Sequence, residues 1–106
     1  MAVTVTVLYP NVSDATFDLE YYLKTHMPLA HKHFGPHGMK GYKVARVVGT
    51  ASGDPAPYSI QCTLEFDTVE QVKTAVSTSA GPVMADVPNF SNQQPIFLIG
   101  EIVGTN

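Results

Sequence analysis

Two kinds of hydrophobic pattern alternate along the chain and predict its secondary structure. Near the N-terminus, Val3, Val5, Val7 and Tyr9 alternate with other side chains in the two-residue period of a strand. In residues 16–34 the apolar positions instead recur at the spacing of an amphipathic α-helix. We expect this helix to begin with Asp14 or Thr16 as its N-cap, because a short polar side chain there accepts a free backbone N–H.

Pro28 lies inside this helical pattern and disturbs it. Proline has no backbone N–H, and its ring pushes against the carbonyl group of Lys24. We therefore predict a kink or a break near Thr25 and His26.

The rest of the chain predicts three more strands and a second helix. Thr68 and Gln71 have the spacing of a capping box, which predicts a helix N-terminus at this point. Residues 80–94 are rich in Gly, Pro, Asn, Ser and Gln, and we expect an irregular segment with one helical turn begun by Pro82. The predicted strands cover residues 41–50, 58–66 and 95–103.

The predicted order β-α-β-β-α-β is that of a ferredoxin-like α+β fold. It gives one four-stranded antiparallel sheet with two helices on one face, and we expect a single domain over residues 1–106. The opposite face of the sheet carries mixed side chains such as Thr4, Thr6, Leu8, Gln61 and Thr63. Pairing two such faces closes a barrel and buries them, so we predict a homodimer with two-fold symmetry.

Composition and charge narrow the class of partner. The net charge is −3 and there is no basic cluster, which argues against nucleic-acid binding. No apolar run approaches the length of a bilayer span, and the N-terminus lacks the plan of a signal peptide, so we expect no membrane association. The single cysteine, Cys62, excludes an internal disulfide and fits a reducing compartment, which predicts the cytoplasm.

His26 is the strongest candidate for chemistry. A helical wheel places it on the apolar side of residues 16–34, together with Tyr22 and Leu23, and places Tyr21 on the polar side. In a pocket between helix and sheet, an imidazole can move a proton to or from a small organic ligand. The alternative is a core histidine bonded to a backbone carbonyl that Pro28 has freed.

Two motifs resemble a known family. Phe17-Asp18, Tyr21-Tyr22 and the run His26-Met27-Pro28-Leu29 resemble the signature helix of the EthD-like family, named for ethyl tert-butyl ether degradation. The later run from Asp86 to Asn92 is similar to that family's Asp-x-Pro-Asn-Phe-Ser/Thr loop, and Pro57-Tyr58 and Phe66-Asp67 also fit. The resemblance implies the dimeric α+β barrel superfamily and makes His26 the motif histidine. It implies a class of pocket, but it does not identify the substrate.

Five further residues are candidates for supporting or ligand-binding roles. The hydroxyl of Tyr22 can orient a ligand or the imidazole, and Tyr42 and Tyr58 can close the mouth of the pocket, although all three suit ordinary core positions. The thiol of Cys62 can assist proton transfer, or it can be a small buried hydrophobe. Asp86 can fix the tautomer of His26, or it can cap a turn with its own side chain.

We expect no metal and no cofactor. Four histidines, His26, His31, His33 and His37, invite a metal interpretation. However, His31 and His33 point in nearly opposite directions on a helix, and Gly35-Pro36 breaks the helix between His33 and His37. There is no phosphate-binding glycine pattern and no dinucleotide fingerprint.

The sequence therefore supports a small cofactor-independent enzyme as the first hypothesis. It would perform general acid/base chemistry (isomerisation, dehydration or O₂-dependent oxidation) on a hydrophobic oxygenated small molecule of a catabolic or polyketide pathway, with His26 as the acid/base. The alternative is a non-catalytic ligand-binding or accessory protein of a degradation or oxidation system. A third hypothesis is an oligomeric stress protein with a filled core.

Overall fold

The computed structural model describes residues 2–106, and its elements follow the predicted order. Three short helical turns extend the main helices: a π turn η1 and the 3₁₀ turns η2 and η3. The elements are β1 (Val3–Pro10), α1 (Leu19–Tyr21), η1 (Tyr22–His26), α2 (Met27–Phe34), η2 (Gly35–His37), β2 (Gly41–Arg46), β3 (Tyr58–Phe66), α3 (Val69–Ala85), η3 (Val87–Asn89) and β4 (Ile96–Glu101).

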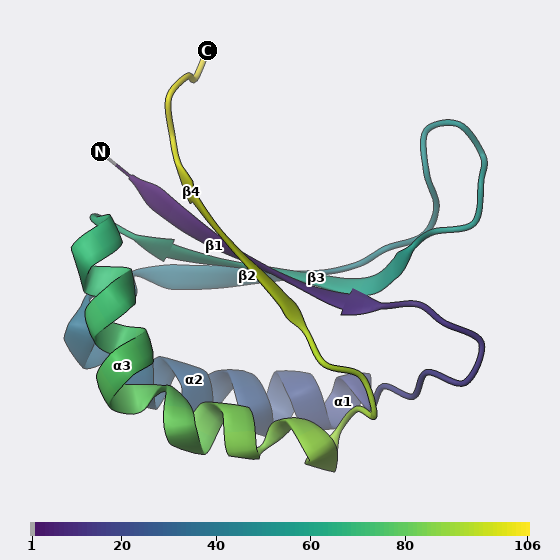
Figure 1. Cartoon of the computed structure of the whole chain (residues 1–106), viewed down its shortest axis with the longest axis horizontal. Helices are drawn as coiled ribbons and strands as arrows, with labels where there is room; N and C mark the ends of the chain where they lie inside the picture. The colour runs from purple at the N-terminus through teal and green to yellow at the C-terminus, as the bar shows by residue number, and fades with distance from the viewer. Residues whose placement is uncertain (1) are drawn as a thin grey trace.

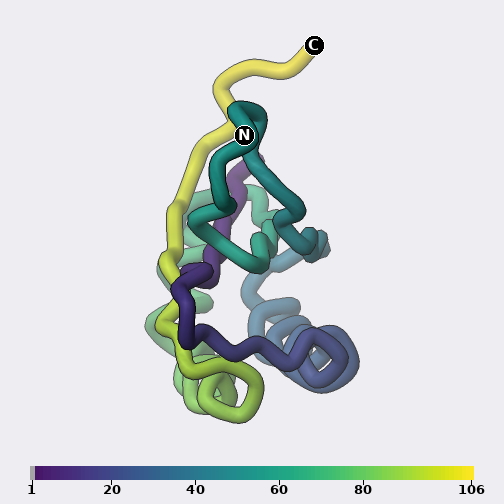
Figure 2. The backbone as a smooth tube through the Cα atoms, turned by 90° about the vertical axis from the view of Figure 1, so that its right-hand side faces the viewer, coloured from purple at the N-terminus to yellow at the C-terminus, as the bar shows by residue number. Residues whose placement is uncertain are grey.

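The four strands form one antiparallel sheet in the order β2-β3-β1-β4. Both helical segments lie on the same face of this sheet, and the other face is uncovered (Figure 1). Seen from the side, α3 lies on the β4 side of the molecule and the α1–α2 segment lies beside it, toward β2 (Figure 2). The ferredoxin-like α+β architecture predicted from the sequence is therefore confirmed.

The core forms where the alternating strands meet the helices. On β1, the positions from Val3 to Tyr9 that the two-residue period assigned to the core are all buried. Val5 pairs with Leu64 and Val7 with Cys62, so β1 and β3 present one continuous apolar surface to the helices. Burial of this surface is the main favourable contribution to folding.

The first helix is interrupted where Pro28 predicted, and the interruption is a π turn. The N–H of Met27 donates to the carbonyl of Tyr22, five residues earlier, instead of to the residue four earlier. Since Pro28 has no N–H to give to Lys24, the helix accommodates one extra residue per turn just before it. The helix then continues as α2 to Phe34.

Two helix boundaries differ from the prediction. The N-cap of the first helix is Asp18, whose side chain accepts the N–H of Tyr21, so the prediction of Asp14 or Thr16 was wrong. Thr68 and Gln71 form the predicted capping box, but α3 continues to Ala85, so residues 80–85 belong to a helix and not to an irregular segment. The burial of Val83 in the core stabilises this last part of α3 despite Pro82 inside it.

Two strands are shorter than predicted, because their partners end. Strand β2 stops at Arg46, since β3 starts at Tyr58 and only the N–H of Val47 still reaches a β3 residue, at the carbonyl of Ser59. Strand β4 stops at Glu101, which pairs with Val3 at the start of β1. A strand extends only as far as its neighbour offers hydrogen bonds.

Candidate active site

His26 is buried and paired with a carboxylate from the other end of the chain. Its side chain is 6% exposed, and its Nδ1 lies 3.0 Å from Oδ2 of Asp86. An ionised carboxylate can only accept a hydrogen bond, so Nδ1 carries the proton and donates it. This tautomer leaves the lone pair on Nε2, the nitrogen that can act as a base.

Asp86 is held by two further side chains, both on its other oxygen. The hydroxyl of Tyr21 donates to Oδ1 at 2.6 Å, and the amide of Asn89 donates to the same atom at 2.9 Å. Partial burial tends to raise the pKa of Asp86, but the hydrogen bonds from Tyr21, Asn89 and His26 outweigh it and hold that pKa below its ordinary value. Asp86 is therefore an anion at neutral pH with a fixed orientation.

The π turn explains why Tyr21 belongs to this network. In an α-helix, positions three and four residues apart share a face, so a regular helix would place Leu23 beside His26. A π turn adds a residue, so positions four and five residues apart share a face instead. Tyr22 and Tyr21 accordingly flank His26, while Leu23 is 45% exposed. Tyr21 was not predicted as a site residue, because a helical wheel of regular period places it on the polar side of residues 16–34.

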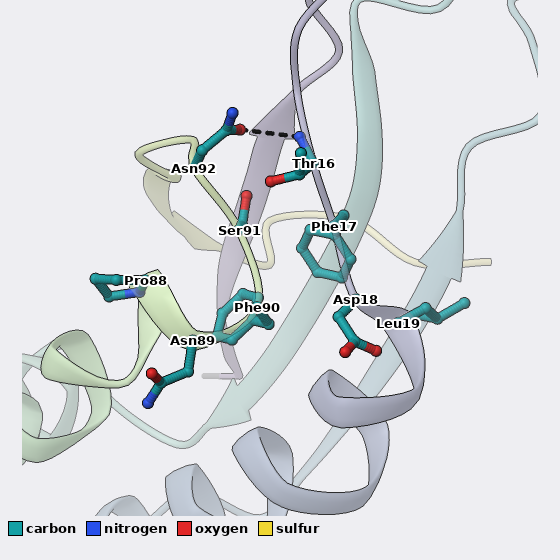
Figure 3. Close-up of a pocket in the computed structure, with 9 residues that line it drawn as sticks. All are labelled: Thr16, Phe17, Asp18, Leu19, Pro88, Asn89, Phe90, Ser91 and Asn92. Atoms are coloured by element: carbon teal, nitrogen blue, oxygen red, sulfur yellow. Dashed lines mark hydrogen bonds between the residues drawn. The ribbon is translucent and has the colours of Figure 1, made fainter.

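The loop after α3 is fastened to the start of the first helix. The N–H of Asp18 donates to the carbonyl of Phe90 at 2.7 Å, and Phe17 and Ser91 form an isolated β-bridge. Figure 3 shows the backbone of Thr16 bonded to the side chain of Asn92, a distance of 2.9 Å. These contacts fix the spacing between the two segments that supply His26 and Asp86.

Aromatic rings set the orientation of the imidazole. Tyr22 stacks on His26 with ring centres 5.2 Å apart and an angle of 17° between the planes. Phe90 contacts the same imidazole from another side, with ring centres 4.5 Å apart. Tyr22 thus contacts His26 through its ring, whereas the role predicted from the sequence was one for its hydroxyl. Phe90, which we did not predict as a site residue, separates His26 from the outer surface.

Burial and the carboxylate act in opposite directions on His26. Burial lowers its pKa, because the charged form loses water, and Asp86 raises it through the hydrogen bond and its charge. The effect of burial is the larger of the two, so the pKa of His26 lies below the ordinary 6.5. The ring is therefore neutral at pH 7, with the Asp86 carboxylate in place to stabilise a transferred proton.

A second group of polar side chains lies deeper, beneath the helix. Burial raises the pKa of the Tyr22 hydroxyl, and the neighbouring Cys62 and Tyr9 act in the same direction. Burial also raises the pKa of the Cys62 thiol to about 11, against a smaller opposite effect of the Tyr22 hydroxyl. Cys62 is accordingly a neutral thiol at physiological pH, which is the unreactive form.

A small cavity adjoins His26 on the core side. It measures about 30 Å³ and is lined by His26, Tyr22, Cys62 and apolar residues of α2, α3 and β4. A much wider depression of about 750 Å³ lies on the outer surface, between residues 16–19 and 88–92 (Figure 3). Phe90 lines that depression too, but His26 does not, so of these two hollows it is the inner cavity that reaches the imidazole.

The remaining candidates lie apart from His26. Tyr42 on β2 is partly exposed and Tyr58 is half-buried at the start of β3, and neither lines the inner cavity. Among the histidines, His37 bonds to Ser79 of α3 at 2.9 Å. Within residues 2–106, no three side chains of the metal-ligating kinds come together.

Several solved structures resemble this chain. An EthD-like protein of Ralstonia eutropha JMP134 is 28% identical, with a TM-score of 0.87 over 99% of this chain and 95% of that one. An EthD family protein of Bacillus halodurans C-125 is 29% identical, with a TM-score of 0.75 over 97% and 100%. SnoaB, a cofactor-independent oxygenase of Streptomyces nogalater, shares the fold at 8% identity, with a TM-score of 0.67 over 98% and 95%.

No curated protein sequence matches the chain. Across the described residues 2–106, the helices are too short or too polar to span a membrane.

The family model for the EthD domain matches residues 9–94, a range that includes the π turn with His26 and the loop with Asp86. The chain belongs to the EthD family.

Proposed function

We propose that this protein is a cofactor-independent enzyme that moves a proton on a hydrophobic, oxygenated small molecule, with His26 as the general acid/base. The observation that carries the proposal is the pair formed by His26 and Asp86, buried beside a cavity. A neutral imidazole oriented by a carboxylate is the arrangement that general-base catalysis uses.

The chemistry follows from the two nitrogens of the imidazole. Nε2 takes a proton from a carbon next to a carbonyl group, or from a hydroxyl group, and the electron pair of that bond stays on the substrate. The imidazolium that forms is stabilised by Asp86, whose hydrogen bond to Nδ1 is already in place. Return of the proton to another atom isomerises the substrate, and loss of a neighbouring hydroxide as water dehydrates it.

The geometry also bears on the alternative of a non-catalytic carrier. A carrier needs an apolar cavity and has no use for a buried acid/base pair, which costs free energy to bury. Here Tyr21 and Asn89 support Asp86, and Asp86 in turn orients His26. An imidazole held by a carboxylate that two further polar side chains hold in turn favours catalysis over carriage.

Proton exchange tests the proposal without knowledge of the natural substrate. Methyl ketones and lactones in heavy water acquire deuterium next to the carbonyl group when a base removes a proton there, and NMR follows the exchange. We expect the wild-type protein to catalyse this exchange for apolar members of the panel. His26→Gln, which keeps the size and polarity of the side chain, should lower the rate by about 10²–10⁴-fold.

The matched control is Tyr42→Phe, which changes a candidate that lies away from the cavity. This variant should exchange at the wild-type rate. A folded His26→Gln protein with undiminished exchange would remove His26 from the mechanism. Exchange by neither protein, over the whole panel, would favour the carrier.

The uncovered face of the sheet supports a homodimer. Leu98 and Ile96 of β4 pair with Thr6 and Leu8 of β1, and both β4 residues are partly exposed on that face. We infer that two copies pair through these faces, which would remove this apolar surface from water. Leu98→Lys should convert the dimer to a monomer in light scattering, whereas Val48→Lys, at an exposed loop position, should not. A monomeric wild-type protein would contradict the inference.

We retain the cytoplasm as the proposed location. Cys62 is buried and is the only cysteine, so the fold gains nothing from an oxidising compartment. Fractionation of the native host, with detection of the untagged protein, tests this placement.

A further inference from the structure

The geometry points to a substrate with two unlike parts: an oxygen-bearing end that reaches His26, and an uncharged hydrocarbon part that occupies a second cavity, between α3 and β4. The inference rests on the proposed function and adds the class of substrate and the residues that select it. Two observations support it: the lining of this second cavity and the side chains that it shares with the first.

The second cavity is a cleft of about 300 Å³ between α3 and the edge strand β4. Twelve residues line it, and all are Ala, Val, Leu, Ile, Met or Phe. The cleft offers no hydrogen-bond partner from a side chain, and a charged or strongly polar group would lose its hydration there without compensation. Its occupant is therefore a hydrocarbon chain or ring.

The cleft adjoins the cavity at His26. Five residues line both: Phe34, Leu64, Val83, Met84 and Phe97. The cavity at His26 measures about 30 Å³, which is room for about two water molecules and far less than a whole substrate needs. A molecule whose reacting group lies at His26 therefore needs more space than this cavity has, and the adjoining cleft is the apolar space that shares its walls.

The cleft also has an opening for entry. Val76 on α3 and Ile99 on β4 both line it, and each is at least half exposed. Because β4 is the edge strand, no further strand closes this side. The small side chains of Ala75 and Ala80 on α3 leave the space that a larger residue would fill.

The size of the cleft limits the hydrocarbon part. Small-molecule sites usually measure about 300–1,000 Å³, and this cleft lies at the lower end of that range. It suits a short alkyl chain or a small ring system. The substrate class is thus a small, uncharged ketone, ester or lactone with one hydrocarbon arm.

Binding of a homologous series tests the inference. We would titrate the methyl n-alkyl ketones from butanone to nonanone into the wild-type protein and follow the imidazole of His26 by NMR. Each added methylene group that enters the cleft should tighten binding by about fourfold, until the cleft is full. Ala80→Leu should remove this gain for the longer ketones and leave butanone nearly unchanged.

Ala85→Leu is the matched control, because Ala85 is an exposed residue of the same helix and does not line the cleft. Should Ala80→Leu fail to fold, Val76→Trp at the exposed rim serves the same purpose. Equal affinity for all chain lengths, or loss of the gain in Ala85→Leu as well, would overturn the inference. Deuterium exchange measured in the same samples separates the two proposals: length-dependent binding without exchange contradicts the proposed function alone.

Discussion

The space between the helices and the sheet has two ends that differ in packing and in polarity. At the end with His26, the rings of Tyr9, Phe17, Tyr22 and Phe90 contact one another at centre distances of 4.9–5.8 Å. At the other end, aliphatic residues of α3 face β4 across a cleft of about 300 Å³. One end is dense and contains a polar network, and the other is loose and apolar.

The difference matches the two demands that the proposed function makes on this space. A buried imidazole and carboxylate keep their geometry only if their surroundings leave no alternative, so the polar end is packed with rigid rings. The hydrocarbon part of a substrate needs space and tolerates variation in its position, so the apolar end can be open. Helix α3 contributes residues to both ends, so it helps to bury the polar end and also borders the space at the apolar end.

The largest effect is expected from Asp86→Asn at the dense end. Asparagine can donate its amide N–H to Nδ1 of His26, which favours the tautomer with the proton on Nε2, the wrong one for a base. Exchange should fall by at least about 100-fold. Because the charge of Asp86 raises the pKa of His26, its loss should also move the acid limb of the pH–rate profile to lower pH.

Asn92→Ala is the control for this prediction. It removes the contacts of the same loop to Thr16 and Asp14, while the hydrogen bond from Asp18 to Phe90 and the bridge between Phe17 and Ser91 still fix the spacing of His26 and Asp86. It should leave the position of the acid limb unchanged. A profile that stays in place in Asp86→Asn would show that the carboxylate has only a structural role.

Truncation of one phenylalanine at each end measures the difference in packing directly. Phe90 is 3% exposed and contacts four other aromatic rings and His26, so Phe90→Ala should cost about 3–5 kcal/mol of unfolding free energy. Phe97 is 47% exposed beside the cleft, and Phe97→Ala should cost about 1 kcal/mol. Urea denaturation gives both values. Equal losses would mean that the two ends are packed alike.

The free energy of unfolding should also depend on pH, because the dense end contains titratable groups. The pKa of His26 is lower in the folded protein than in the unfolded chain, where it is about 6.5, so the unfolded chain binds the proton first as pH falls. The contribution of His26 is therefore complete above that value and is lost below it, with a slope of at most about 1.4 kcal/mol per pH unit. The pKa of Asp86 is lowered too, so its contribution is lost at more acidic pH, in the same direction.

Urea denaturation of the wild type and His26→Gln between neutral and mildly acidic pH tests this dependence. Glutamine does not titrate, so the slope of the variant should be the smaller of the two over this interval. A difference of the opposite sign would mean that His26 is charged in the folded state.

Residues whose role follows from local spacing could be predicted from the sequence. The alternation in β1, the capping box of Thr68 and Gln71 and the inward direction of His26 all depend on near neighbours in the chain, and the structure confirms them. The pairing of His26 with Asp86 was one of two interpretations, since either a partner or a turn satisfies an aspartate in such a loop.

What could not be predicted depends on the exact helical period or on distant segments. Pro28 indicated an interruption, but nothing in the sequence indicated that it would be a π turn, which brings Tyr21 to Asp86 and turns Leu23 outward. Likewise, the composition of residues 80–94 indicated an irregular segment with one helical turn begun by Pro82, whereas contact of Val83 with the core keeps all of residues 80–85 helical. In both cases tertiary packing decided between local alternatives.

The smallest effect is expected from Tyr21→Phe, which tests the consequence of the π turn. This variant keeps the ring that stacks near Phe90 and removes only the hydroxyl that donates to Asp86. Exchange should fall by less than about tenfold, because Asn89 still holds the same oxygen. The pKa of Asp86 should rise, since one of the hydrogen bonds that lower it is lost. NMR titration of the carboxylate measures this shift.

The double variant with Asn89→Ala gives the sharper result. With both donors removed, Asp86 has only His26 to hold it, so the combined loss of exchange should exceed the product of the two single losses. Leu23→Ala is the control, because the π turn places that residue on the exposed side. If Leu23→Ala lowers exchange and Tyr21→Phe does not, the helix has the regular period in solution, and the support that Tyr21 gives to the dense end is lost.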